Sequence, residues 1–145
     1  MIIYNVHEIK DKLCHFRRHD CVVIICKYNR GKSSIATDLI HEYFGEDYTF
    51  YVTFIDQSKP NFIPRKSKLK FGEITKDKII VFDELSDEKG RDINGYVKRL
   101  IDKNLVIILS NPYGKGNDAE KEIKLFKEHE KDILPENTLF IFVKE

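Results

Sequence analysis

The chain has 145 residues, a length typical of one domain with a full hydrophobic core. Its 25 basic and 24 acidic side chains give a net charge of +1, which excludes a general electrostatic attraction to nucleic acid or membranes. The three cysteines, Cys14, Cys21 and Cys26, are odd in number and lack metal-ligand spacing, which argues against a disulfide framework and for a reducing compartment. We expect one cytoplasmic domain over 1–145 without a membrane segment, because the apolar runs are only strand-sized.

The first part of the chain alternates between helical and extended patterns. Apolar residues three and four positions apart predict a helix over 5–19, and the continuous apolar run at 21–25 predicts a strand buried on both faces. Helical spacing returns over 32–44. The aromatic and β-branched run at 48–55 predicts the next strand.

The second part continues this alternation. Its predicted strands are 78–84, 105–111 and 138–143, and its predicted helices are 91–103 and 118–131. The helical residues expected to face the core are Ile93, Val97, Leu100, Ile101, Ile123 and Phe126. Five apolar strands separated by helices or long connections predict an α/β fold, a three-layer sandwich around a mainly parallel five-stranded sheet.

Between the first long strand and the second helix lies the stretch CKYNRGKS, residues 26–33, which ends like a phosphate-binding loop. In such a loop the main-chain N–H groups at the start of a helix surround a phosphate. Lys32 would reach the β- and γ-phosphates, and the Ser33 hydroxyl would bind Mg²⁺. Cys26 stands where the loop normally opens with glycine, which a small residue with ordinary dihedral angles can replace. The alternative is a strand–turn–helix with an exposed lysine and no ligand.

Two acids, Asp83 and Glu84, directly follow the apolar run KIIVF. Carboxylates at the end of a buried strand are costly unless they face cations or water. In a phosphate-loop enzyme, Asp83 would hold Mg²⁺ through water, and Glu84 would orient and deprotonate the attacking water. The alternative is that the strand simply leaves the sheet into a charged, solvated loop.

The strand 105–111 ends in Ser110 and Asn111. Ligands of open parallel sheets bind at the carboxyl ends of the strands, where an amide can touch the γ-phosphate or the attacking water. Asn111 followed by Pro112 is also an ordinary start of a turn. Polar groups at the carboxyl ends of three strands together predict a P-loop nucleoside triphosphatase.

These three stretches resemble the Walker A (26–33), Walker B (79–84) and sensor-1 (105–111) elements of the additional-strand, catalytic-glutamate division of P-loop NTPases. The resemblance runs from about residue 21 to the end. It implies a RecA-like core in which the sensor strand separates the Walker A and Walker B strands. It also implies ATP as substrate and Mg²⁺ as cofactor.

Carried over to this sequence, the resemblance gives three groups of site residues. The catalytic residues would be Lys32, Glu84 and Asn111, with Glu84 as the base and Asn111 as the sensor. The metal would be held by Ser33 and Asp83. The nucleotide-binding residues would be Asn29, Arg30, Gly31, Lys32, Ser33 and Ser34. Within the division, ILSNP after an apolar strand is similar to the third motif of superfamily 3 helicases, and viral genome-packaging ATPases share the same three elements.

A basic stretch at 59–78 carries seven lysines and arginines against two acids, with Phe62 and Phe71 interleaved. Such lysines neutralise phosphates, and such aromatic rings stack on bases, so nucleic acid is a candidate partner. The alternative is a solvated loop whose phenylalanines cover the edge of the sheet.

The resemblance also implies hydrolysis between subunits, with an arginine from a neighbour, so we expect a homo-oligomer or an arginine-supplying partner. Arg30, Arg91 and Arg99 are candidates, although the helix around Arg99 can equally be a plain cover of the sheet. The predicted function is Mg²⁺-dependent ATP hydrolysis coupled to the handling of nucleic acid, as in helicase-like, replication or packaging ATPases. The alternatives are a nucleotide-binding regulatory or assembly subunit with little turnover, and a small-molecule kinase, which would need clustered arginines. If the protein is viral, the compartment would be the host cytoplasm.

Overall fold

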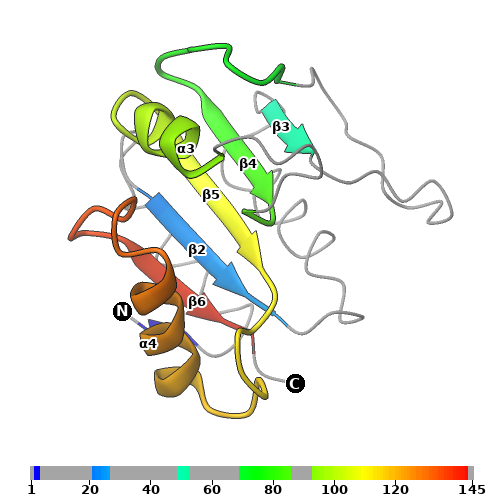
Figure 1. The fold of residues 1–145 in the computed structure, drawn as a ribbon, viewed down its shortest axis with the longest axis vertical. Helices are drawn as coiled ribbons and strands as arrows, with labels where there is room; N and C mark the ends of the chain where they lie inside the picture. Colours follow the sequence, from blue (N-terminus) through cyan, green and yellow to red (C-terminus); the bar gives the residue numbers. More distant parts are fainter. Residues whose placement is uncertain (1, 4–20, 27–48, 53–68, 86–92, 144–145) are drawn as a thin grey trace, which may run out of the picture.

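The computed structural model describes residues 2–3, 21–26, 49–52, 69–85 and 93–143. These residues form an α/β fold with one parallel sheet and two helices (Figure 1). The predicted helices at 5–19 and 32–44 lie outside the described residues. No helix in the part that is described has the length and apolar character needed to cross a membrane.

The sheet is built from strands that are rich in valine, isoleucine and phenylalanine. Their bounds are β1 Ile2–Ile3, β2 Cys21–Ile25, β3 Thr49–Val52, β4 Ile79–Asp83, β5 Leu105–Ser110 and β6 Leu139–Phe142. All five predicted strands are present, each within its predicted range. The expected count of five is wrong, because the two-residue strand β1 adds a sixth member that is too short to leave a periodic pattern.

The strand order is β1-β6-β2-β5-β4-β3, and every pairing is parallel. β5 therefore lies between β2 and β4, which is the order that the resemblance to P-loop NTPases implies for the sensor, Walker A and Walker B strands. The register pairs Ile25 with Ser110 and Asp83 with Leu109. The three central strands thus end within one residue of each other, at the same edge of the sheet.

Two helices cover one face of this sheet. α3 spans Ile93–Ile101 and α4 spans Ala119–His129. α4 is shorter than predicted at both ends and α3 at its carboxyl end, while residues 91–92 lie outside the described residues. Figure 1 shows both helices in front of the sheet, and their apolar residues share a core cluster with alternate strand residues such as Val23, Phe82 and Val106. All six helical residues predicted to face the core are buried, because their three- and four-residue spacing places them on one side of each helix.

Side chains on the opposite face of the sheet are buried as well. Val22, Ile24, Val81, Ile107 and Leu109 are each at most 1% exposed. This two-sided burial explains why the strands read as continuous apolar runs instead of alternating patterns. Burial of each such side chain stabilises the folded state by about 1.5–3 kcal/mol relative to an exposed position.

The amino edge of the sheet is fixed by a buried asparagine, Asn104, between α3 and β5. Its Oδ1 accepts hydrogen bonds from the Lys78 N–H (3.0 Å) and the Thr75 hydroxyl (3.2 Å). Its Nδ2 donates to the carbonyls of Thr75 (3.0 Å) and Leu100 (2.9 Å). Four bonds from one fully buried side chain therefore tie the segment before β4 to the end of α3.

Replacement of Asn104 by alanine should lower the free energy of unfolding by about 2–4 kcal/mol, because it removes these bonds and leaves the Lys78 N–H without its acceptor. Urea denaturation measures the change. The neighbouring exposed Lys103 is the matched control, and Lys103→Ala should stay within about 0.5 kcal/mol of the wild type. Equal unfolding midpoints for the two variants would contradict this account of Asn104.

Candidate functional site

The candidate site lies at the carboxyl edge of the three central strands. One residue beyond β2, the Cys26 N–H donates to the Ser110 carbonyl (3.0 Å), and one residue beyond β4, the Glu84 N–H donates to the Leu109 carbonyl (2.8 Å). These bonds extend both ladders, so Cys26 and Glu84 flank the end of β5. Because adjacent strands are about 4.8 Å apart, the two backbones lie roughly 10 Å from each other.

Glu84 is held to β5 by its side chain as well as by its backbone. Its Oε1 accepts a hydrogen bond from the Asn111 N–H at 3.0 Å, and the residue is half-buried. Its φ of +75° lies in the left-handed region, which costs a residue other than glycine about 1–3 kcal/mol. Glu84 itself is therefore bound to the end of β5, while residues 86–90, the rest of the charged stretch in which the alternative places a solvated loop, lie outside the described residues.

The other predicted residues of this edge are Asp83 and Asn111. Asp83 is the last residue of β4, paired with Val52 and Leu109, and its backbone alone is described. The Ser110 hydroxyl donates to the Asn111 carbonyl at 2.8 Å, so the chain turns sharply after β5. The structure thus brings Glu84 and Asn111 together at one point.

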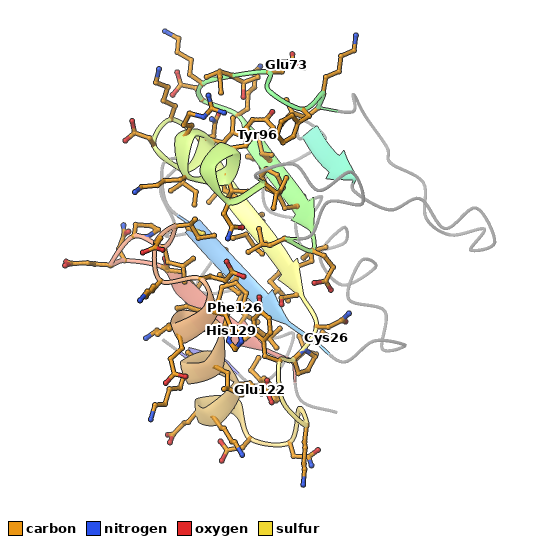
Figure 2. All side chains as sticks on the ribbon, in the orientation of Figure 1. Cys26, Glu73, Tyr96, Glu122, Phe126 and His129 are labelled. Carbon is orange, nitrogen blue, oxygen red and sulfur yellow. The ribbon has the colours of Figure 1, made fainter. Side chains whose placement is uncertain are left out.

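Cys26, at the opening of the predicted phosphate loop, is buried at the end of β2 (Figure 2). The residues other than glycine with positive φ in the described ranges are Asp77 and Glu84. Cys26 therefore has an ordinary φ, and the conformational freedom of glycine is not required at this position. The rest of the predicted nucleotide site lies outside the described residues: Asn29, Arg30, Gly31, Lys32, Ser33 and Ser34.

The two predicted Mg²⁺ donors are not among the described side chains, so the structure does not test this site. Ser33 lies outside the described residues, and so does the side chain of Asp83. In the ranges that are described, no three His, Cys, Asp or Glu side chains gather around one point. Nucleotide-bound Mg²⁺ needs only one or two protein oxygens besides phosphates and waters, so a cluster of three such side chains is not required for the predicted site.

The described end of the basic stretch, residues 69–78, lies at the amino edge of the sheet, opposite the candidate site (Figure 2). Phe71 packs edge-on against Tyr96, with ring centroids 5.0 Å apart. The Tyr96 hydroxyl lies 2.6 Å from the Glu73 carbonyl and 3.1 Å from that of Lys70. Phe71 therefore covers the core, as the alternative interpretation of the stretch expects, while Phe62 and 59–68 lie outside the described residues.

Of the three candidate arginines, Arg99 alone is described. It lies in the last turn of α3, with its guanidinium 5.9 Å from the centroid of the Tyr96 ring. This is the amino edge of the sheet, so Arg99 is remote from Glu84 of its own chain. Any role as an arginine finger would act on the site of a neighbouring chain.

The loop between β5 and α4 is fixed by Glu122, a buried acid that the sequence pattern did not single out. Its two carboxylate oxygens accept hydrogen bonds from the N–H groups of Gly114 (3.1 Å) and Gly116 (2.9 Å), and 2% of the residue is exposed. A Cβ at Gly114 would lie 2.6 Å from Glu122 Oε1, and Gly116 has a φ of +76°. Gly114 is needed because its backbone lies too close to Glu122 for a side chain, and Gly116 is needed because of its positive φ.

A second polar cluster joins this loop to both helices. The Tyr113 hydroxyl donates to Glu130 Oε1 (2.7 Å), and Asn94 Nδ2 donates to Glu130 Oε2 (2.9 Å). Partial burial raises the pKa of Tyr113 well above its usual range, and the hydrogen bond to Glu130 and the charges of Glu130 and Glu84 raise it further. Tyr113 is therefore a neutral phenol that is close to the acid of the candidate site.

No protein-family model, curated protein or solved structure gives a significant match to this chain. The functional interpretation therefore rests on the sequence motifs, the strand order and the contacts of Glu84 and Asn111 at the carboxyl edge.

The Gly114→Ala substitution should lower the free energy of unfolding by about 1–3 kcal/mol, because the new methyl group meets the Glu122 carboxylate. A double-mutant cycle with Glu122→Ala identifies the cause. If the clash is responsible, the double variant should be more stable than the sum of the two single losses predicts. Strictly additive losses in urea denaturation would rule out the contact as the reason for glycine.

Tyr113 should ionise well above pH 10, the ordinary range of tyrosine. Because the native state holds this proton more tightly than the unfolded state, its contribution to stability is complete below about pH 10 and is lost as the pH rises through the native pKa. The near-ultraviolet tyrosinate band of the wild type, minus that of Tyr113→Phe, measures the ionisation. A difference signal that develops around pH 10 would contradict the burial and charge assigned to this phenol.

Proposed function

We propose that this chain is a P-loop nucleoside triphosphatase that binds Mg²⁺-ATP at the carboxyl edge of β2, β5 and β4. In this proposal the protein is a three-layer, RecA-like NTPase core that works in the cytoplasm. The observation that carries it is the position of Glu84. Its backbone and carboxylate are both bonded to the end of β5, next to the strand that leads into CKYNRGKS.

The residues at this edge have different roles in the proposed reaction. Main-chain N–H groups around Gly31 and the Lys32 ammonium bind the phosphates, and Ser33 and Asp83 hold Mg²⁺, which withdraws electrons from the phosphates when bound. Glu84 accepts a proton from the water as its oxygen attacks the γ-phosphorus and the bond to the β–γ bridging oxygen breaks.

The contact between Glu84 and Asn111 supports this assignment for a physical reason. A catalytic base must be held in one orientation, because a small displacement from the attacking water lowers the reaction rate strongly. The Asn111 N–H fixes the carboxylate at 3.0 Å, and the left-handed backbone of Glu84 sets the direction from which the side chain leaves the strand. Strain of this kind is retained where the surrounding structure holds the residue in place, often at functional sites.

The ordinary φ of Cys26 is compatible with a working phosphate loop, because the loop can begin without a glycine. Coupling to nucleic acid and an arginine from a neighbouring chain are part of the same proposal. Arg99, at the far edge of its own sheet, is suitably placed only for such a contact in trans.

The Glu84→Gln substitution should lower the rate of ATP hydrolysis by about 100-fold or more while Mg²⁺-ATP still binds, because the amide keeps an acceptor for Asn111 but cannot take a proton. Lys32→Ala should weaken nucleotide binding itself. Hydrolysis is measured by phosphate release, with and without single- and double-stranded nucleic acid, and binding by calorimetry.

Glu136→Gln, an exposed change of the same chemistry, is the control and should retain the wild-type rate. Wild-type turnover in Glu84→Gln would contradict the assignment of the base. Nucleotide binding without hydrolysis under every condition would select the regulatory subunit.

A further inference from the structure

Two aromatic rings lie stacked and exposed beside the loop that follows β5. The rings of Tyr113 and His129 are stacked in nearly parallel planes, with centroids 4.4 Å apart and an interplanar angle of 6°. Tyr113 is 42% exposed, one of two large apolar side chains with such exposure in the described residues, and His129 is exposed as well. Exposed aromatic faces that lie together offer a flat surface on which a planar ligand can stack.

Both rings are fixed before any ligand arrives. The Tyr113 hydroxyl is bonded to Glu130, and its ring contacts Phe126 at a centroid distance of 5.7 Å. His129 Nδ1 lies 2.8 Å from the Leu125 carbonyl, so the ring donates there and keeps its orientation at the end of α4 (Figure 2). A flat ligand that stacks on this pair would cost little side-chain entropy.

Lysines surround the two rings in sequence. Lys115 follows Tyr113 by two residues, and Lys127 and Lys131 lie two residues to either side of His129, all three exposed. The nearby acids are the exposed Glu128 and Asp132 and the buried Glu130, whose two oxygens are already bonded to Tyr113 and Asn94.

The position of Lys115 is fixed by the loop that carries it. Its two neighbours, Gly114 and Gly116, both donate their N–H groups to Glu122, so the backbone of the loop tip is held rigidly. The Lys115 side chain is exposed and makes no hydrogen bond or ion pair with the residues that the structure describes. An exposed cation on a loop whose backbone is held in this way is suited to meet a phosphate.

We propose that the Tyr113–His129 stack is a base-stacking site for single-stranded nucleic acid, with Lys115 and Lys131 as phosphate contacts. Flat rings bind the faces of unpaired bases without reading sequence, and lysines follow the backbone. A duplex, whose bases are already stacked, fits this surface poorly. The inference deepens the proposed function and rests on it for the link to hydrolysis. That link is the short distance in sequence between Tyr113 and Asn111, which are two residues apart, since the Asn111 N–H is bonded to Glu84.

The test uses a single-stranded oligonucleotide containing 2-aminopurine, whose fluorescence is quenched when the base stacks. His129→Ala should weaken binding by about 5- to 100-fold and remove the quenching, whereas His129→Phe, which keeps a flat ring, should retain both. Lys115→Ala should lower the slope of log affinity against log salt by about one. Lys98→Ala, an exposed lysine at the far end of α3, is the matched control and should change neither quantity.

Tight binding of the same sequence as a duplex, equal affinity in His129→Ala and the wild type, or equal loss in His129→Ala and His129→Phe would each overturn the stacking site. Mg²⁺-ATP binding is measured in parallel on every variant. If the oligonucleotide binds as expected and ATP does not, the proposed hydrolase fails and the stacking site stands. If ATP is hydrolysed and the wild type binds no oligonucleotide, the stacking site alone fails.

Discussion

The parallel pairing of β5 with β2 on one side and β4 on the other is the constraint on which the candidate site depends. The three strands are apolar and buried on both faces, so polar groups can emerge from them only at their ends. The register places those ends within one residue of each other, and the bonds from Cys26 to Ser110 and from Glu84 to Leu109 carry the alignment one step past the strands. A shift of one residue in the β4–β5 pairing would separate Glu84 from Asn111, and a shift in the β2–β5 pairing would move Cys26 away from the end of β5.

Buried carboxylates then fix the segments around this edge. Glu122, on α4, is hydrogen-bonded to the loop that follows β5, and Glu130 joins that loop to the first turn of α3. Each accepts two hydrogen bonds, which offsets the cost of removing its charge from water. The loop that begins at Asn111 is therefore tied to both helices as well as to Glu84, directly after β4.

The sequence was sufficient for the central sheet, because buried parallel strands leave long apolar runs. It also placed Glu84 and Asn111 at the ends of neighbouring strands, but the bond between them is made by the main-chain N–H of Asn111, which no side-chain pattern signals. It did not reveal β1, which has two residues and no period. The burial of Glu122 and Glu130 was not predicted either, because a charged amphipathic helix has the same sequence pattern whether one of its acids faces a loop or water. The Tyr113–His129 pair joins residues distant in sequence, and no local pattern signals such a contact.

The central claim is that the carboxyl edge of β2, β5 and β4 binds a metal-bound nucleoside triphosphate. Isothermal titration calorimetry with a non-hydrolysable ATP analogue tests it most directly, because it needs neither turnover nor a partner. The account predicts saturable heat with one nucleotide per chain, greatly reduced when Mg²⁺ is chelated. An absence of heat with millimolar adenine and guanine nucleotides in the presence of Mg²⁺ would contradict it.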